Sequence, residues 1–456
     1  MNAPDSLAQS TAIPRRTLVI AFLFCFLGLL ADGADLMFLA YSLNSLKAEF
    51  GLSNFEAGSL GSVTLAGMAI GGIYGGWACD RFGRVRVVTW TILVFSLGTA
   101  LLGLAHNFWA FALIRFVSSL GLGSLFVACN ILMSEFVTAK YRTTILATMQ
   151  AGWTVGYLVA TVLAGLIIPD YGWRALFFTA IGAALICLAL RPWVPESPSW
   201  LAARAQRVQQ ADSGRRQAVA SGGMRQLLVD PSTRRMFVLW SLTSCFLLFG
   251  YYGTNNWMPS YLESELGMNF KSMTGYMVGT YTAMILGKVL AGIASDRFGR
   301  RATFAAGAIG TAIFMPVIVF WHTPDNIVWI LALFGFIYGV PVGVLATYMT
   351  ESFSTQVRGA AVGTSYNLGR IGAAVAPAAI GLLASHVSIG AGFLVMGITY
   401  VITGLIPALM IPNRLYDPNR EARTAQPSAP APAPAHAPAH SAARPLGQPV
   451  TEESLR

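Results

Sequence analysis

Two carboxylates lie deep inside an apolar stretch near the start of the chain. Asp32 and Asp35 fall within the run from about Thr17 to Tyr41, which is otherwise without charge. Roughly 20 apolar residues cross a hydrocarbon core, so this run predicts a transmembrane helix that carries two acids. Their spacing places both on one helix face, where desolvation and mutual repulsion favour proton binding. The pair predicts a proton-coupling site, and two acids neutralised by structural partners are the alternative.

Three basic residues also fall within apolar runs. Arg115 lies at about the same membrane depth as the two acids, so it either links proton uptake to anion binding or forms a fixed ion pair between the first and fourth spans. Arg370 lies near the midplane, where a guanidinium can bind a substrate carboxylate through two parallel hydrogen bonds or form a structural ion pair. Lys288 lies closer to a helix end, so its ammonium can snorkel to the interface.

The stretch Gly250–Trp257 combines glycines, aromatic rings and amides. Its two glycines permit local unwinding, and its rings could stack on a planar substrate. Ordinary packing is the alternative for such a stripe. The residues predicted to bind substrate together with Arg370 are Tyr251, Asn255, Asn367 and Trp153.

Composition places the chain among polytopic membrane proteins. Of its 456 residues 55% are hydrophobic and 11% charged, whereas soluble domains carry about 25% charged residues. The five cysteines are scattered without metal-ligand spacing, and no nucleotide-binding loop or nucleophile motif is present. These features predict a protein that is not an enzyme and that has no cofactor and no metal site.

Apolar runs between polar segments predict an all-α integral membrane fold with twelve transmembrane helices in two six-helix bundles. We expect an N-terminal segment at 1–16, a first bundle at 17–193, a linker at 194–235, a second bundle at 236–411 and a disordered tail at 412–456. The predicted spans are 17–44, 56–78, 87–105, 108–133, 145–168, 174–193, 236–262, 273–294, 302–320, 327–349, 361–385 and 389–411.

The distribution of basic residues predicts the orientation of these spans. Of the 30 Lys and Arg residues, only Lys47, Arg174 and Lys271 fall in loops on the side opposite the chain ends. This asymmetry predicts that both termini are cytoplasmic, because cytoplasmic loops carry the excess of Lys and Arg. It also accounts for the net charge of +10 without a nucleic-acid partner.

The two predicted bundles are copies of one unit. Asp80-Arg81-Phe82-Gly83-Arg84 recurs as Asp296-Arg297-Phe298-Gly299-Arg300, an offset of 216 residues, the difference between 80 and 296. The same offset relates Glu135 to Glu351 and Gly156 to Gly372. The charged residues within the spans do not recur. At this offset Asp32, Asp35, Arg115 and Arg370 correspond to the uncharged residues Leu248, Tyr251, Leu331 and Thr154. Parallel repeats of this kind place a substrate site at their interface, near the membrane midplane.

The segment Gly76–Arg84 and its repeat at 292–301 resemble the cytoplasmic loop signature of the major facilitator superfamily. Arg115 with Gly121-Leu122-Gly123 resembles the fourth-span motif of this superfamily, and Pro195–Leu201 resembles a segment that closes its sixth span. The tetrapeptide Asp32-Gly33-Ala34-Asp35 resembles the paired aspartates of the aromatic acid:proton symporter family. Residues predicted to act in gating are Asp80, Arg81, Arg84, Glu135, Arg142, Asp296, Arg297, Arg300, Glu351 and Arg358.

These resemblances and the buried charges predict a secondary transporter that imports an aromatic or related small carboxylic acid with a proton, by alternating access. The expected partners are the carboxylate, the proton and the lipid bilayer, and the expected form is a functional monomer in a bacterial-type inner membrane. A proton-driven exporter of drugs or metabolites is an alternative, although Tyr157 follows Gly156 where drug antiporters of the superfamily usually have Pro. A receptor that binds the acid without moving it is another alternative.

Overall fold

The computed structural model describes residues 14–137, 142–197, 200–201, 204–205, 229–354 and 357–413, and every regular element in these ranges is a helix. The first half contains α1 (Arg15–Phe50), α2 (Asn54–Phe82), α3 (Arg84–Leu102), α4 (Phe108–Phe136), α5 (Arg142–Phe178), α6 (Ala180–Leu190) and η1 (Arg191–Trp193). The second half contains α9 (Pro231–Ser260), η2 (Tyr261–Glu265), α10 (Phe270–Phe298), α11 (Arg300–Phe320), α12 (Ile327–Thr350), α13 (Arg358–His386) and α14 (Ile389–Met410). Most of the predicted segments 1–16, 194–235 and 412–456 lies outside the described residues.

The predicted set of twelve spans is confirmed. Eleven of the described helices are long and apolar enough to cross a membrane. The remaining span does not begin as a separate helix, because α5 continues through a turn into its first residues. Gly172 forms this turn, with a φ of 77° that favours glycine. Residues 173–178 together with α6 therefore correspond to the predicted span 174–193. Several helices extend past their predicted limits, as α10 does to Phe298, because charged residues such as Arg297 continue the helix beyond its apolar part.

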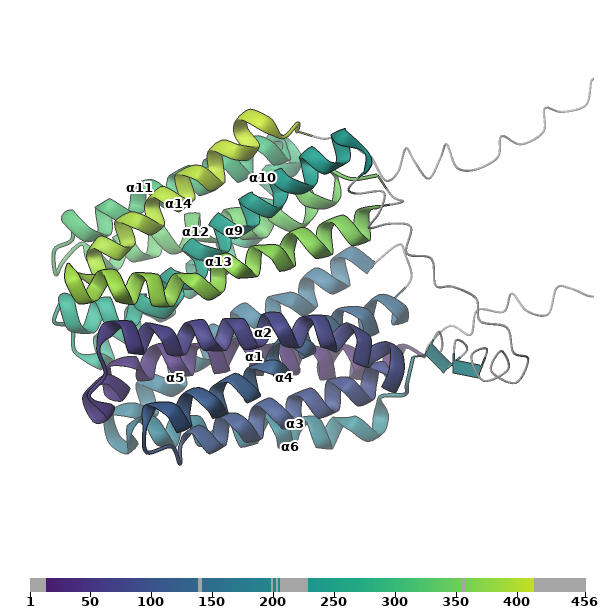
Figure 1. Ribbon diagram of the computed structural model, residues 1–456, viewed down its shortest axis with the longest axis horizontal. Helices are drawn as coiled ribbons and strands as arrows, with labels where there is room; N and C mark the ends of the chain where they lie inside the picture. The colour runs from purple at the N-terminus through teal and green to yellow at the C-terminus, as the bar shows by residue number, and fades with distance from the viewer. Residues whose placement is uncertain are drawn as a thin grey trace, which may run out of the picture. The chain divides into compact units, whose positions relative to one another are not determined.

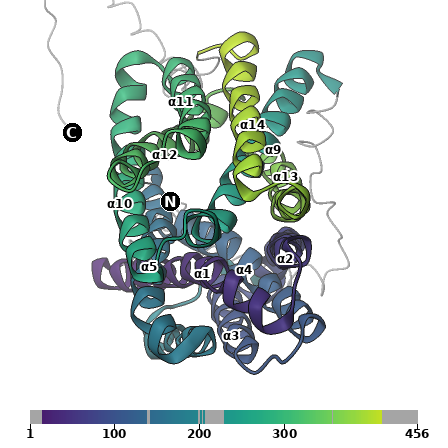
Figure 2. The ribbon, with the colours of Figure 1, turned by 90° about the vertical axis from the view of Figure 1, so that its left-hand side faces the viewer.

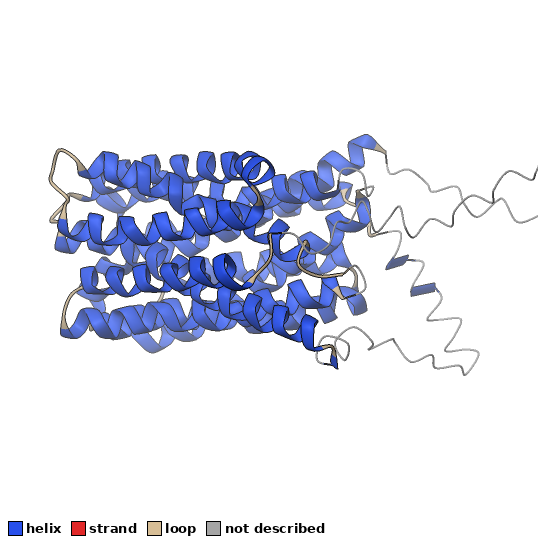
Figure 3. Ribbon diagram, turned by 90° about the horizontal axis from the view of Figure 1, so that it is seen from above, coloured by secondary structure: helices blue, strands red, loops and turns tan. Residues whose placement is uncertain are grey.

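The helices form two bundles, α1–α6 and α9–α14, which occupy the lower and upper parts of Figure 1. Figure 2 looks along the helices and shows α2 beside α13 and α5 beside α10 at the boundary between the bundles. Figure 3 shows the same helices from above. Since α2 and α5 are related to α10 and α13 by the sequence offset, the two boundary contacts are copies of one arrangement.

Backbone conformation repeats at the same offset. Gly51 and Gly267 have φ angles of 65° and 64°, and Gly83 and Gly299 have angles of 104° and 91°. An L side chain adopts these angles only with strain, so glycine is required at each of the four helix ends. We call the loop end of the bundles that carries Gly51 the Gly51 end, and the opposite end the Gly83 end.

The two halves contact each other closely toward the Gly51 end. Asn54 donates to the carbonyl of Ala384 at 3.1 Å, and the backbone N–H of Phe55 donates to the hydroxyl of Ser385 at 3.2 Å. A Cβ atom on Gly58 would lie 2.2 Å from the carbonyl oxygen of Pro377, so glycine is needed for this approach of α2 to α13. The described hydrogen bonds between the halves all lie between this end and the level of Arg370 and Lys288.

Glycines also set the packing of helices within each half. A Cβ on Gly123 of α4 would lie 1.9 Å from the carbonyl oxygen of Met68 on α2. The repeat has the same contact, because a Cβ on Gly339 would lie 2.4 Å from the carbonyl oxygen of Met284. Small residues let helix backbones approach in a membrane, where packing replaces the hydrophobic effect as the source of stability.

We predict that Gly123→Ala destabilises the protein, because the added methyl overlaps backbone atoms that cannot move without separating α4 from α2. Overpacking of this kind costs about 1–3 kcal/mol. The measurement is the thermal unfolding midpoint of purified protein in detergent. Gly182→Ala is the matched control, because no atom lies within 4 Å of a Cβ at Gly182. Equal midpoints for the two variants would contradict this account of the packing.

Candidate functional site

The two acids of α1 are held in place by close contact between α1 and α5. A Cβ on Gly33 would lie 2.1 Å from the carbonyl oxygen of Trp153, and a Cβ on Gly156 would lie 2.1 Å from that of Leu30. The glycine between the two aspartates is therefore a packing requirement. Asp32 and Asp35 are both buried, with 1% of each residue exposed.

Asp35 forms a buried ion pair with Arg115 of α4. The Nη1 atom of Arg115 lies 2.7 Å from the carboxylate of Asp35, and 0% and 2% of the two side chains are exposed. Thr99 of α3 donates a hydrogen bond to the same carboxylate, and Arg115 donates through Nε to the hydroxyl of Thr64 on α2 at 2.9 Å. One network thus joins four helices of the first half. Its geometry is that of the fixed ion pair, one of the two alternatives predicted for Arg115.

Asp32 lies in a different environment from Asp35. Both of its carboxylate oxygens are buried without a hydrogen-bond partner in the part of the chain that the structure describes. The charged groups that act on it electrostatically are Asp35, Arg370 and Arg115. Burial of an ionised carboxylate without a partner is costly, so this group is suited to exchange a proton.

Arg370 of α13 reaches across the boundary between the halves. Its Nη1 donates to the carbonyl of Met68 on α2 at 2.9 Å, and 7% of the residue is exposed. Gly72 of α2 lies next to it, since a Cβ there would be at van der Waals distance, 3.5 Å, from the same nitrogen. No ion pair within the described ranges includes Arg370. Its charge acts on Asp32 of the first half and on Tyr252 and Tyr366 of the second.

Aromatic side chains from both halves meet beside these charges. The rings of Trp153 on α5 and Tyr252 on α9 have centroids 6.2 Å apart, and the indole N–H of Trp153 has no hydrogen-bond partner among the described residues. Tyr251 stacks on Tyr338 of α12, with centroids 5.3 Å apart and an angle of 7° between the planes. Aromatic rings from α5, α9 and α12 thus pack together at this part of the boundary.

The amide of Asn255 takes part in a network inside the second half. It donates to the hydroxyl of Tyr338 at 2.7 Å and to the carbonyl of Tyr251 at 2.8 Å, and it accepts from the hydroxyl of Tyr281 at 3.2 Å. Asn367 is exposed and donates to the carbonyl of Gly363 in its own helix at 3.0 Å. The structure thus brings Tyr251 and Asn255 together and places Trp153 beside Tyr252, whereas Asn367 has no described contact with this group.

The local unwinding that the two glycines of the seventh span would permit does not occur. α9 is continuous from Pro231 to Ser260, and the glycines at 250 and 253 serve helix packing. A Cβ on Gly250 would lie 2.5 Å from the ring of Tyr400, and one on Gly253 would lie 2.7 Å from the sulfur of Met396. Sequence alone cannot separate a glycine that breaks a helix from one that admits a neighbouring side chain.

The expectation that Lys288 snorkels to the membrane interface is also wrong. Its ammonium donates to the hydroxyl of Thr154 on α5 at 2.8 Å, across the boundary between the halves. α10 continues to Phe298, so the residue lies farther from the helix end than the predicted limit at 294 implies.

The sequence did not identify Tyr252, Tyr366 and Asn256 as candidate site residues, because their neighbours come from helices that are distant in the chain.

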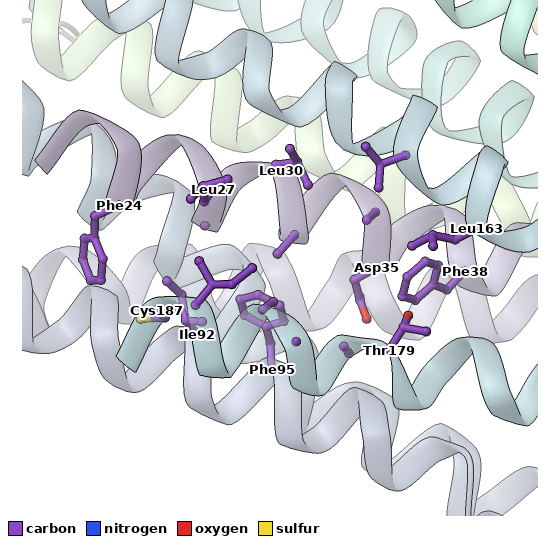
Figure 4. A pocket seen from close by; sticks show the side chains of 18 of the residues that line it. Phe24, Leu27, Leu30, Asp35, Phe38, Ile92, Phe95, Leu163, Thr179 and Cys187 are labelled. Carbon is purple, nitrogen blue, oxygen red and sulfur yellow. The ribbon is translucent and has the colours of Figure 1, made fainter. Parts of the chain in front are cut away.

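One pocket lies inside the first half. It measures about 220 Å³, and its walls come from α1, α3, α5 and α6. Figure 4 shows Asp35 and Thr179 among apolar side chains such as Phe38 and Phe95. A smaller pocket of about 20 Å³ lies at the boundary beside Thr64, Tyr252 and Asn256. The apolar lining of the large pocket does not suit a carboxylate, whereas charged and polar groups converge at the boundary.

Comparison with known proteins agrees with this architecture. The sequence profile of the Major Facilitator Superfamily matches residues 22–282 and 271–450. The chain belongs to the Major Facilitator Superfamily. A cis,cis-muconate transport protein of Acinetobacter baylyi is 61% identical over 412 residues, which cover 90% of this chain and 98% of that protein. A gentisate transporter of Corynebacterium glutamicum is 29% identical over 83% of this chain and 84% of its own length.

A crystal structure of a D-xylose-proton symporter has the same fold, with a TM-score of 0.71 and 22% identity over 87% of this chain and 98% of that chain. As a member of the superfamily, the chain is a multi-pass membrane protein and a secondary transporter rather than an enzyme. The resemblance to the aromatic acid:proton symporter family, drawn from the aspartate pair, agrees with the relatives named above.

The superfamily's loop signature builds the same charge cluster in each half at the Gly83 end. Arg84 lies 3.0 Å from both Asp80 and Glu135, and its repeat Arg300 pairs with Asp296 and, at 3.4 Å, with Glu351. These ion pairs join α2, α3 and α4 in the first half and α10, α11 and α12 in the second.

The rest of the signature follows the same pattern. Glu196 accepts from the backbone N–H groups of Arg84 and Val85 at 2.8 and 3.1 Å, and Asn413 accepts from that of Arg301 at 3.0 Å. The remaining predicted gating arginines lie nearby. Arg81 and Arg297 lie over the rings of Trp77 and Phe298, Arg358 donates to the carbonyls of Thr350 and Phe353, and the side chain of Arg142 lies outside the described part.

We predict that Arg115→Met destabilises the protein by about 3–5 kcal/mol, because it leaves Asp35 buried without its counter-charge. The double variant Asp35→Asn, Arg115→Met should lose less than the sum of the two single losses. The measurement is the thermal unfolding midpoint in detergent.

Arg174→Met is the control for this cycle, because its ion pair with Glu49 is partly exposed and such pairs contribute about 0–1 kcal/mol. Additive losses in the double variant, or an equal loss in the control, would contradict the assigned role of the buried pair.

Proposed function

We propose that the chain imports cis,cis-muconate, or a dicarboxylic acid of closely similar shape, together with a proton. The observation that carries this proposal is the buried, unpartnered carboxylate of Asp32, on which the Arg370 guanidinium acts from the other half. The 61% identity to a muconate transport protein, over nearly the whole of both chains, supports the choice of substrate.

Arg370 supplies the means of anion recognition. Its described hydrogen bond goes to a neutral carbonyl, so its positive charge is available to an incoming carboxylate. A planar guanidinium binds a carboxylate through two parallel hydrogen bonds, which fixes the orientation of the substrate as well as its charge. Because Arg370 belongs to the second half and contacts the first, its ligand would lie at the surface along which the halves move.

Asp32 supplies the coupling to protons in this proposal. In the empty site the Arg370 charge offsets part of the cost of ionising Asp32, which burial and the neighbouring Asp35 oppose. When a substrate carboxylate takes up that charge, Asp32 loses its compensation and binds a proton, since an uncompensated buried carboxylate is unfavourable. The other titratable or charged groups around Asp32 are Asp35, Arg115, Cys129 and Tyr252. Asp35 is held by its ion pair with Arg115, and the hydrogen bonds of this pair link four helices of the first half around the proton site.

The contacts between the halves support alternating access. With both termini in the cytoplasm of a bacterial cell, as the distribution of basic residues favours, the Gly51 end faces outward. The described hydrogen bonds between the halves then close the outer side, and the site would communicate with the cytoplasm. Import would require the halves to part at Asn54 and Phe55 and to approach each other at the Gly83 end. One chain supplies both halves, so a monomer is sufficient for this cycle.

We predict that purified protein in proteoliposomes accumulates radiolabelled muconate when a proton gradient is directed inward. In Asp32→Asn the gradient should no longer drive accumulation, while exchange of internal for external muconate continues, because exchange needs no net proton transfer. Asp325→Asn, at an exposed position, is the control. Gradient-driven accumulation by Asp32→Asn would refute the coupling role of Asp32.

A second prediction concerns Arg370. Hydrogen bonds to charged groups contribute about 1.5–3 kcal/mol, so Arg370→Met should raise the KM for muconate by roughly 10- to 100-fold. Arg370→Lys should recover part of this loss, since it keeps the charge without the paired hydrogen bonds. Uptake kinetics in proteoliposomes measure both, with exposed Arg235→Met as the control. An unchanged KM in Arg370→Met would exclude Arg370 from substrate binding.

A further inference from the structure

The two boundary contacts between the halves each contain one cation, a buried guanidinium in one and a partly buried ammonium in the other. Gly72 and Arg370 meet where α2 contacts α13, and Lys288 and Thr154 meet where α10 contacts α5. The sequence offset relates Gly72 to Lys288 and Thr154 to Arg370. The cation lies on α13 in one contact and on α10 in its copy. Both cations therefore come from the second half, although they occupy opposite sides of the repeated interface.

The side chain of Lys288 is directed toward the first half by its surroundings. Gly339 and Gly343 of α12 pack against its backbone, since Cβ atoms there would lie 3.2 Å from its nitrogen and 2.8 Å from its oxygen. The ammonium donates to Thr154 at 2.8 Å and lies 5.9 Å from the centroid of the Tyr251 ring. Within the described ranges Lys288, like Arg370, takes part in no ion pair.

A chain of aromatic contacts leads from Lys288 to Tyr252, on which the charge of Arg370 acts. Tyr251, which lies under the Lys288 ammonium, has its ring centroid 5.4 Å from that of Tyr252. Tyr252 in turn lies beside Trp153 and within the electrostatic reach of Arg370. A ligand with a flat, unsaturated middle and a carboxylate at each end would place its middle on these rings and its ends on the two cations.

We propose that Lys288 is the second anion-binding residue of the site and that it binds the second carboxylate of a dicarboxylate whose first carboxylate is held by Arg370. This inference rests on the proposed function, because it assigns the selectivity of the same site. The charges agree with it. With Asp35 and Arg115 neutralising each other and Asp32 carrying the coupled proton, Arg370 and Lys288 give the site a charge that matches a dianion.

The test compares muconate with hexa-2,4-dienoate, which has the same carbon skeleton and diene but a methyl group in place of one carboxylate. Wild-type protein should transport muconate with the lower KM. Lys288→Gln should raise the KM for muconate at least tenfold and change that for hexadienoate less than twofold, so that the preference disappears. Lys288→Arg, which keeps the charge, should restore the preference. Lys271→Gln, at an exposed position in the first turn of the same helix, is the control.

The outcomes separate this inference from the proposed function. If wild-type protein transports muconate and Lys288→Gln keeps the wild-type preference, the inference is overturned and the proposed function stands. An equal rise of both KM values in Lys288→Gln also overturns it, because that result indicates a structural role. If wild-type protein transports neither compound, or hexadienoate alone, the proposed function fails and the inference fails with it. Transport of hexadienoate by Lys288→Gln also shows that the variant is folded.

Discussion

The cost of burying charge in a membrane is the constraint on which the rest of this structure depends. An ionised side chain at this depth needs a counter-charge. In the first half Asp35 is paired with Arg115, in a network that joins four helices. Asp32, Arg370 and Lys288 are left without such a pair in the described structure. In our account these three groups are balanced only when substrate and proton are both present.

The duplicated scaffold explains how such a site can also move. Helix ends, glycine contacts and the charge clusters at the Gly83 end recur at one sequence offset, so the halves are two copies of a stable unit. The buried charges do not recur. Each half therefore keeps its own fold while the boundary between them holds the groups that respond to substrate. Close contact through Gly58 at one end and through Arg370 at mid-depth holds the halves together in this conformation.

Sequence was sufficient for the twelve spans and the repeat, because apolar runs, recurring glycines and charged loop motifs can be recognised in the chain itself. The sequence also predicted that Asp35 and Arg115 lie at the same depth in the membrane, and the structure places them in contact. It could not show which of two acids three residues apart is paired, because that depends on Thr99 and Arg115 from other helices. For the same reason it misjudged Lys288, whose partner Thr154 comes from the opposite half.

The most direct test of this account is the number of protons taken up when muconate binds to purified protein in weakly buffered detergent solution, followed with a pH indicator. We expect uptake of about one proton per bound muconate, because the substrate carboxylate takes up the Arg370 charge that otherwise acts on Asp32. Binding of muconate with no proton uptake would contradict the central claim that Asp32 and the substrate share one cationic site.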